Sequence, residues 1–213
     1  TGEIKNKKTA NLGNLKFTII DNKHILLKGS LHKYAHEGFN YSDFTFSNLN
    51  STLQVLGTDF LGNLSNWTIQ NIEFGVNITN PAYPSELFFN SILLHKTKSF
   101  SPMGSKNPIG IECYHNQYGI KIYSKKIQYK LQEDIMRTEI KTTRMYFLRH
   151  YDIVSLADLT YNHKLKHLEI LLQNCIDDLL FIDYNFLEAN LPIKHKKLII
   201  DSKNPRFWTK LHN

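Results

Sequence analysis

The sequence predicts an α+β fold in which an antiparallel β-sheet carries helices on one face and leads into a helical C-terminal part. Segments with the two-residue apolar period of half-buried strands recur up to residue 143, and segments with a helical period stand at 47–61 and beyond residue 155. We expect an α+β domain over residues 1–150, with residues 151–213 forming a helical extension packed on the same domain.

The first elements predicted are a hairpin and a helix. Residues 15–20 and 24–31 are apolar and strand-forming, and the Asp-Asn pair at 21–22 is typical of a tight turn between them. Farther along, apolar residues recur every three or four positions, which predicts a helix over about 47–61 that ends at Gly62.

The middle of the chain alternates apolar and polar residues in several segments. A strand is predicted within residues 67–78, a hairpin is predicted from 109–114 and 118–124, and a third strand-forming segment spans 135–143. The apolar run at 88–94 fits either a strand or a helix, and both interpretations stay open.

The last part of the chain has a helical pattern. Beyond Ser155 a stripe of leucines predicts two helices that break near residues 161–163, with Ser155 and Asp158 as a capping box. Pro192 precedes a basic cluster at 194–197, after which we expect a short strand or a tail.

The composition indicates a globular protein that favours polyanionic partners. Of 213 residues, 41% are hydrophobic, which supports a packed core and excludes a disordered chain. Lys and Arg number 26 against 19 Asp and Glu, and this net charge of +7 favours nucleic acid as a partner. No apolar run approaches the ~20 residues of a membrane span, and residues 1–8 lack the apolar core of a signal peptide, so we expect no membrane partner. The two cysteines lie far apart and form neither a zinc pattern nor a disulfide framework, so we expect a cytoplasmic location.

The histidine pairs and the cysteines are weak candidates for metal binding or catalysis. His32 and His36 have helical spacing, as do His163 and His167, but no acidic residue completes a metalloprotease motif, and we expect both pairs at the surface. Cys113 lies within a predicted strand, where a packed thiol is expected rather than a nucleophile.

Three predicted strands place polar side chains opposite their apolar face. These side chains are Glu73, then Lys121 and Tyr123, then Arg137 and Glu139. A sheet covered by helices on one side leaves the other side for substrate, so we expect these groups to meet on the open face. Two carboxylates amid basic residues suit Mg²⁺ or Mn²⁺, and a tyrosine beside the ion could attack a phosphorus atom. The plain alternative is that both glutamates are solvated and paired with lysines, and that the tyrosine only fills the sheet surface.

Residues 118–126 (YGIKIYSKK) resemble the signature of a known family. The run resembles the "hydrophobic-Arg/Lys-Ile-Tyr-Asp/Asn-Lys-Lys" signature of rolling-circle replication initiators of the Rep_trans type, which are found on plasmids and have relatives among phage replication proteins. In that family an Arg-x-Glu strand follows, here residues 137–139, and an acidic strand precedes by about fifty residues, here residues 71–73. Residues 28–34 (KGSLHKY) also resemble a segment of phage and plasmid replication proteins, so the similarity extends over about residues 14–150.

The resemblance implies a metal-dependent tyrosine endonuclease, a DNA nickase and strand transferase that acts at a single-stranded or cruciform replication origin. Tyr123 would form a covalent 5′-phosphotyrosine intermediate, and Glu73 and Glu139 would hold Mg²⁺ or Mn²⁺. DNA phosphates would contact four basic side chains, Lys121, Lys125, Lys126 and Arg137. The helical C-terminal part would form a homodimer or grip duplex DNA.

Other features leave the function open. Ser124 stands where the family usually has Asp or Asn, and Gln128 lies near a position often held by Glu, so no third metal ligand is identified. A non-catalytic nucleic-acid-binding module of the same fold is one alternative. A structural interaction protein is another, and it would hold Glu73, Tyr123 and Glu139 far apart.

Overall fold

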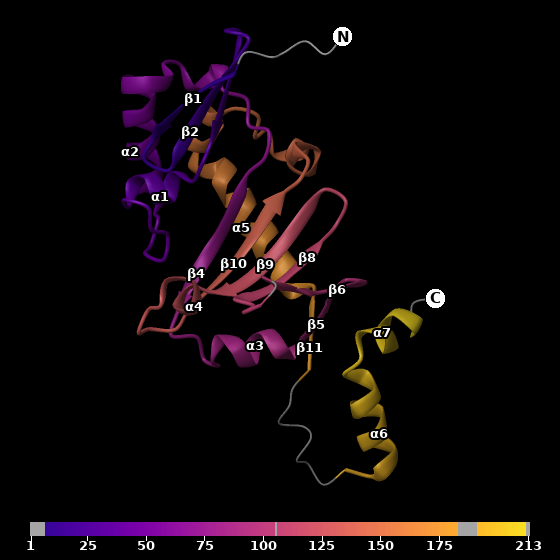
Figure 1. The fold of residues 1–213 in the computed structure, drawn as a ribbon. Helices are drawn as coiled ribbons and strands as arrows, with labels where there is room; N and C mark the ends of the chain where they lie inside the picture. The colour runs from indigo at the N-terminus through magenta and orange to yellow at the C-terminus, as the bar shows by residue number, and fades with distance from the viewer. Residues whose placement is uncertain (1–6, 105, 183–190, 212–213) are drawn as a thin grey trace. The chain divides into compact units, whose positions relative to one another are not determined.

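Antiparallel sheets with helices beside them make up the structure, which confirms the α+β class (Figure 1). The computed structural model describes residues 7–104, 106–182 and 191–211. The chain divides into a first unit, Thr1–Thr68 with Ser155–Asn162, and a second unit, Ile69–Val154 with His163–Asn213.

These two units cut across the boundary after residue 150 that the sequence suggests. The start of the helical part belongs to the first unit because Ser155 forms an antiparallel β-bridge with Thr68. The amide of Leu156 also donates to the carbonyl oxygen of Trp67 at 2.9 Å. No periodicity marks these pairing residues, so their contact is not visible in the sequence.

A three-stranded antiparallel sheet, ordered β1-β2-β3, opens the first unit. Its strands are β1 (Lys7–Leu12), β2 (Leu15–Ile20) and β3 (His24–Lys28). The predicted hairpin of β2 and β3 is confirmed, and Asp21 and Asn22 turn the chain with φ of 52° and 53°. β1 is not predicted from the sequence, because its residues are mostly polar and exposed and show no apolar alternation.

The second strand of the hairpin is shorter than the predicted 24–31. Gly29 follows it with a φ of 154°, and a Cβ there would lie 2.7 Å from the backbone oxygen of Asn14. Ser30 then caps the short helix α1 (Leu31–Ala35) by accepting a hydrogen bond from a backbone amide of the first turn. The chain therefore leaves the sheet three residues earlier than expected.

The helix predicted at 47–61 is confirmed with a change at its end. α2 (Phe46–Leu56) begins with a reciprocal capping box between Thr45 and Asn48. Its continuation, Gly57–Leu61, is a π-helical turn, and Gly62 ends it as predicted.

The first unit has a small apolar core. Two 3₁₀ segments, Leu64–Asn66 and Leu156–Thr160, complete the unit, and the second of them opens with the predicted capping box. The buried core residues are Leu15, Leu56 and Leu61.

The second unit contains a five-stranded antiparallel sheet with the order β4-β10-β9-β8-β7. Its strands are β4 (Glu73–Thr79), β7 (Ser101–Met103), β8 (Gly110–Tyr114), β9 (Tyr118–Ser124) and β10 (Ile135–Thr142). The predicted hairpin is β8 and β9, and β4 and β10 are the other predicted strands.

One face of this sheet is apolar and packs on helices, as predicted. α3 (Ser85–Ser91) and α5 (Asn162–Asp177) both contribute to the core, and Figure 1 shows α5 running across the sheet. The buried core residues are Phe89, Ile92, Tyr118, Ile120, Ile122, Met136, Ile140, Leu172, Cys175 and Leu179.

The apolar run at 88–94 is the end of a helix followed by a strand, so each open interpretation holds for part of it. After α3, β5 (Ile92–His95) pairs with β6 (Lys98–Ser99) and with β11 (Leu179–Phe181) in a separate small sheet. Leu179, the last leucine of the stripe that predicts helices, therefore lies in the strand β11.

Short helices complete the second unit. They are α4 (Lys125–Tyr129), a 3₁₀ segment (Met145–Tyr151), α6 (Ile193–Ser202) and α7 (Pro205–Leu211). The expectation of a strand or tail after residues 194–197 is wrong, because the basic cluster is part of α6. None of the helices in the described ranges has the length and apolar character that crossing a bilayer requires.

Candidate active site

The face of the five-stranded sheet opposite the apolar core carries the polar groups predicted from the sequence. The strand register forms three facing pairs, Glu73 with Lys141, Lys121 with Glu139, and Tyr123 with Arg137. Because side chains alternate along a strand and facing residues share a side, all of them project from the same face. The sequence-predicted groups from three strands therefore meet, as expected.

Glu139 is the centre of this group. Its Oε2 accepts hydrogen bonds from the Tyr123 hydroxyl at 3.2 Å and from Arg137 Nε at 2.7 Å. Its Oε1 accepts from Lys121 Nζ at 3.3 Å. The side chain is only 6% exposed, so these donors take the place of water around the carboxylate. Arg137 is oriented in turn by Asn77, whose Oδ1 accepts from Nη1 at 3.0 Å.

Glu73 is linked to Glu139 through a shared ammonium group. Lys121 Nζ lies 3.2 Å from Glu73 Oε1 as well as 3.3 Å from Glu139 Oε1, and Lys141 Nζ lies 3.1 Å from the same Glu73 oxygen. With Arg137, three cations and two carboxylates form one connected network. Glu73 and Lys141 are each about 40% exposed, so the network reaches solvent at this rim.

The charges of the network determine which groups are ionised. Burial by itself would raise the pKa of Glu73, but Lys121 and Lys141 outweigh it and lower that pKa. Burial would lower the pKa of Lys121, but Glu139 and Glu73 raise it above its usual range. Burial and the neighbouring Glu139 raise the pKa of the Tyr123 phenol despite the opposing charge of Arg137. At neutral pH Glu73 and Lys121 are therefore charged, and the phenol keeps its proton.

Tyr123 is buried in contact with charged groups and a glycine. Its side chain is 6% exposed, and the ammonium of Lys125 lies 4.8 Å from the ring centroid. Gly110 faces Tyr123 on β8, and a Cβ on this glycine would clash with Tyr123 and with the backbone oxygen of Ile122. Tyr123 can therefore pack directly against β8 because Gly110 has no side chain.

Lys125 and Lys126, the two lysines that follow β9, lie in different surroundings. Lys125 is 0% exposed, its Nζ donates to Gln128 Oε1 at 3.0 Å, and it lies over the rings of Tyr123 and Tyr129. Such burial is not compatible with the predicted phosphate contact of Lys125, since the ammonium is closed off from solvent. Lys126 is exposed on α4, so a phosphate can reach it.

The two positions that depart from the family signature have local roles. The Ser124 hydroxyl accepts a hydrogen bond from the amide of Ile127 at 3.2 Å and caps α4, while Gln128 binds Lys125. Neither residue adds a carboxylate to the polar face.

Several residues of the site have no role assigned from the sequence. Alternation already places Lys141 and Asn77 on the polar faces of Glu139 and Glu73, but it does not show which groups they bind. Gly110 could not be found this way, because only the register of β8 against β9 shows that it faces the tyrosine.

Glu73 and Glu139 supply the type of ligand that a divalent ion such as Mg²⁺ or Mn²⁺ prefers, and one oxygen of each approaches the same ammonium group. Mg²⁺ is commonly held by one or two carboxylates, with water and a substrate phosphate filling the remaining positions. The Lys121 ammonium lies within 3.3 Å of an oxygen of each carboxylate, which shows that both stabilise a positive charge at one point. Within the described ranges, no group of three or more His, Cys, Asp or Glu side chains is placed to hold a metal ion. Protein carboxylates alone would therefore supply only part of the coordination shell.

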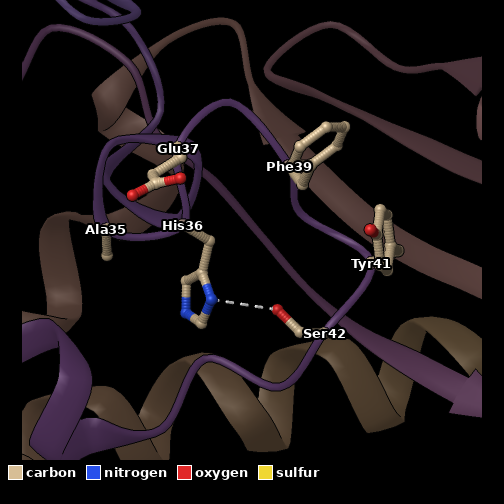
Figure 2. A pocket seen from close by; sticks show the side chains of 6 residues that line it. All are labelled: Ala35, His36, Glu37, Phe39, Tyr41 and Ser42. Atoms are coloured by element: carbon tan, nitrogen blue, oxygen red, sulfur yellow. Dashed lines mark hydrogen bonds between the residues drawn. The ribbon is translucent and has the colours of Figure 1, made fainter.

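His32 and His36 form a separate cluster in the first unit, shown in part in Figure 2. The expected surface position is wrong for His32, which is 8% exposed and stacks on Phe44 with ring centroids 4.8 Å apart. The Ser42 hydroxyl lies 3.2 Å from His36 Nδ1 and 3.5 Å from His32 Nε2. A shallow hollow of about 350 Å³ opens beside His36 and Ser42.

The remaining candidates from the sequence have structural surroundings. His163 and His167 are both exposed, as predicted. Cys113 is buried, and burial raises the pKa of its thiol to about 11, which fits the predicted packed thiol. Cys175 is also free and buried.

Comparison with known proteins gives no family for this chain. A scan of protein-family models and searches of curated proteins and of solved structures each find no match. The likeness to rolling-circle initiators therefore rests on its short motifs, and the site is defined by its own geometry.

Proposed function

We propose that the protein nicks and rejoins single-stranded origin DNA through a covalent 5′-phosphotyrosine on Tyr123, as a replication initiator would. The observation that supports this most is the hydrogen bond from the Tyr123 hydroxyl to Glu139 at 3.2 Å, inside a network that also contains three cations. A nucleophile, a proton acceptor and positive charge in one place are the parts that phosphoryl transfer requires.

In the proposed reaction, Tyr123 Oη attacks a DNA phosphorus atom and its proton passes to Glu139 Oε2. A bond forms between Oη and phosphorus, and the bond between phosphorus and the 3′ oxygen breaks. The 3′ oxygen takes a proton from water and becomes a hydroxyl that can prime synthesis. Joining is the reverse: the 3′ hydroxyl gives its proton to solvent as its oxygen attacks the phosphotyrosine, the bond between phosphorus and Oη breaks, and Glu139 returns its proton to the Tyr123 oxygen. This acceptor is needed because the pKa of Tyr123 is raised and the phenol is neutral at working pH.

A divalent ion and the basic residues of the polar face would together stabilise the DNA phosphate. Glu73 and Glu139 would hold Mg²⁺ or Mn²⁺, and an ion bound there would neutralise charge on the phosphate oxygens. Lys121 would have to release both carboxylates for that ion, and its freed ammonium could then contact a phosphate oxygen. Exposed Lys126 would bind a phosphate farther along the strand.

The net charge of +7 supports DNA as the partner, and the resemblance implies single-stranded or cruciform DNA. The basic cluster at 194–197 lies on α6, where it would add contacts to duplex DNA. A homodimer stays a prediction from the resemblance.

The burial of Tyr123 favours one alternative, a nucleic-acid-binding module without transfer activity. With 6% of its side chain exposed, the phenol must be uncovered before a phosphate reaches it. The cations on the same face would bind phosphates whether or not a reaction follows.

Covalent capture distinguishes these two functions. The protein is incubated with Mn²⁺ and random-sequence pools of single-stranded and cruciform DNA, and adducts are read on a denaturing gel. We expect an adduct with the wild type, none with Tyr123→Phe, and an unchanged yield with Tyr129→Phe, which alters the other ring beside Lys125. An adduct that survives Tyr123→Phe would contradict the proposal, and so would DNA binding without any adduct.

A further inference from the structure

Tyr114, the last residue of β8, is an exposed aromatic side chain on the same face as the proposed site. In the register it faces Gly119, which faces Lys141, which in turn faces Glu73. Its side chain is 47% exposed, so the ring is open to solvent on one side. Gly119 and Tyr123 are four residues apart on β9, a distance of about 13 Å along the strand.

Two contacts hold the Tyr114 ring in place. Its hydroxyl donates a hydrogen bond to Glu112 Oε2 at 2.9 Å. The ring lies so close over Gly119 that a Cβ on this glycine would be 2.5 Å from two ring atoms. An aromatic ring fixed at both ends loses little conformational freedom when a ligand covers its open side.

The charged groups near Tyr114 include the lysines Lys121 and Lys141 as well as Glu112. Burial and the bond to Glu112 raise the pKa of the phenol, so the ring is neutral at working pH. Lys141 stands in the same row of the register as Tyr114, and Lys121 stands in the next row, between Tyr114 and Tyr123. A DNA strand that placed a phosphate at Tyr123 would therefore pass Lys121 before its flanking bases reach the Tyr114 ring.

We propose that Tyr114 is a stacking platform for an unpaired nucleobase of single-stranded DNA, a few nucleotides from the phosphate that reaches Tyr123. This inference rests on the proposed function in one respect, that this face binds single-stranded DNA. Bases of any sequence stack on exposed aromatic side chains, so the platform would add affinity without sequence preference. A purely structural tyrosine that covers Gly119 would instead stabilise the sheet and leave DNA binding unchanged.

The test compares two ligands of the same charge that differ in their bases. Labelled oligothymidine of about twelve nucleotides and an abasic phosphodiester chain of equal length are titrated without divalent ions and followed by fluorescence anisotropy. The wild type should bind oligothymidine about tenfold more tightly than the abasic chain, since stacking contributes on that scale. Tyr114→Ala should lose this preference and keep its affinity for the abasic chain, whereas Tyr114→Phe should keep both.

Two further variants guard against effects on folding and on other tyrosines. Tyr114→Leu keeps an apolar cover over Gly119 without an aromatic face, so it should lose the preference even if Tyr114→Ala does not fold. Tyr83→Ala removes another exposed tyrosine, 57% exposed, and should bind both ligands like the wild type.

The outcomes separate this inference from the nickase proposal. A base preference that persists in Tyr114→Leu, or a wild type without any preference, would overturn the platform. Adduct formation with Mn²⁺ is measured separately on the same variants. Loss of every adduct together with a retained base preference would remove the nickase proposal and leave the platform standing.

Discussion

Lys121 Nζ lies 3.3 Å from Glu139 Oε1, on two residues that face each other directly between β9 and β10. The two side chains are only 13% and 6% exposed, so their ion pair forms within the protein surface and not in open solvent. The same ammonium binds Glu73 at 3.2 Å. It therefore occupies the position that the two carboxylates could offer to a divalent ion.

Replacing Lys121 should lower the unfolding free energy of the protein and raise its affinity for a divalent ion. In Lys121→Met, buried Glu139 loses one of its cations, which should cost about 3 kcal/mol of unfolding free energy without metal. Mn²⁺ should bind more tightly to this variant and restore part of the loss, as read from denaturant unfolding with and without the ion. Lys141→Met is the matched control, since Lys141 is 39% exposed and its ion pair at Glu73 should be worth less than ~1 kcal/mol. Equal Mn²⁺ affinity in Lys121→Met and the wild type would contradict the claim that the Lys121 ammonium occupies the position of the ion.

A methyl group on Gly110 should damage the site from the neighbouring strand. Because a Cβ there would clash with the backbone of β9, Gly110→Ala should lower the unfolding free energy by about 2 kcal/mol or more and displace Tyr123. Gly57→Ala is a suitable control: Gly57 has helical φ and ψ, and an added Cβ would meet its nearest atoms at 3.5 Å. That variant should be neutral or more stable by up to about 1 kcal/mol. Urea unfolding compares the two, and similar losses in both would count against the close packing at Tyr123.

The two adjacent lysines should differ in how they affect DNA binding. Lys126→Met should reduce the slope of log affinity against log salt for single-stranded DNA by about 0.7, because one phosphate contact is lost. Lys125→Met should leave the slope unchanged, since this ammonium is buried over the rings of Tyr123 and Tyr129. Titrations over a range of salt concentrations measure both slopes. A lower slope in Lys125→Met would show that its ammonium reaches DNA after all.

Stability should depend on pH through a buried histidine in the second unit. His95 is 0% exposed, with Nδ1 at 2.8 Å from His115 Nε2 and Nε2 at 3.9 Å from Asp178. Burial, then His115 and Lys96, lower the pKa of His95 to about 4 from the usual 6.5. Between these values the unfolded chain binds a proton that the folded chain does not, so acid favours unfolding.

The unfolding free energy should therefore fall as pH drops from about 6.5 to 4, by up to about 3 kcal/mol from His95 alone. Above pH 6.5 this histidine should contribute no pH dependence. Denaturant unfolding at several pH values measures the slope, and His95→Gln should flatten it. A wild type and a variant with equal slopes would show that His95 does not titrate in this way.

The sequence-based prediction succeeds where one local rule decides the outcome. Alternation along a single strand is enough to put Glu73, Tyr123 and Glu139 on polar faces, and the structure brings these faces together. It does not tell which strands are neighbours, so neither the shared ammonium of Lys121 nor the glycine opposite Tyr123 could be foreseen.

Burial of polar residues is the other part that local patterns miss. Lys125 and Lys126 look alike in the sequence, but α4 turns one ammonium under two aromatic rings and the other into solvent. His32 is likewise buried through its contact with Phe44, a residue that no spacing rule connects to it. The packing of particular side chains decides both cases, and no alternation or spacing rule describes that packing.

Mass spectrometry of the captured DNA adduct tests the central claim most directly. After reaction with Mn²⁺ and DNA, the protein is digested with protease and nuclease, and the peptide that carries a phosphonucleotide is sequenced. The proposed chemistry predicts one modified peptide, with the phosphonucleotide on Tyr123. A phosphonucleotide on any other residue, or none on a protein that has bound the DNA, would contradict it.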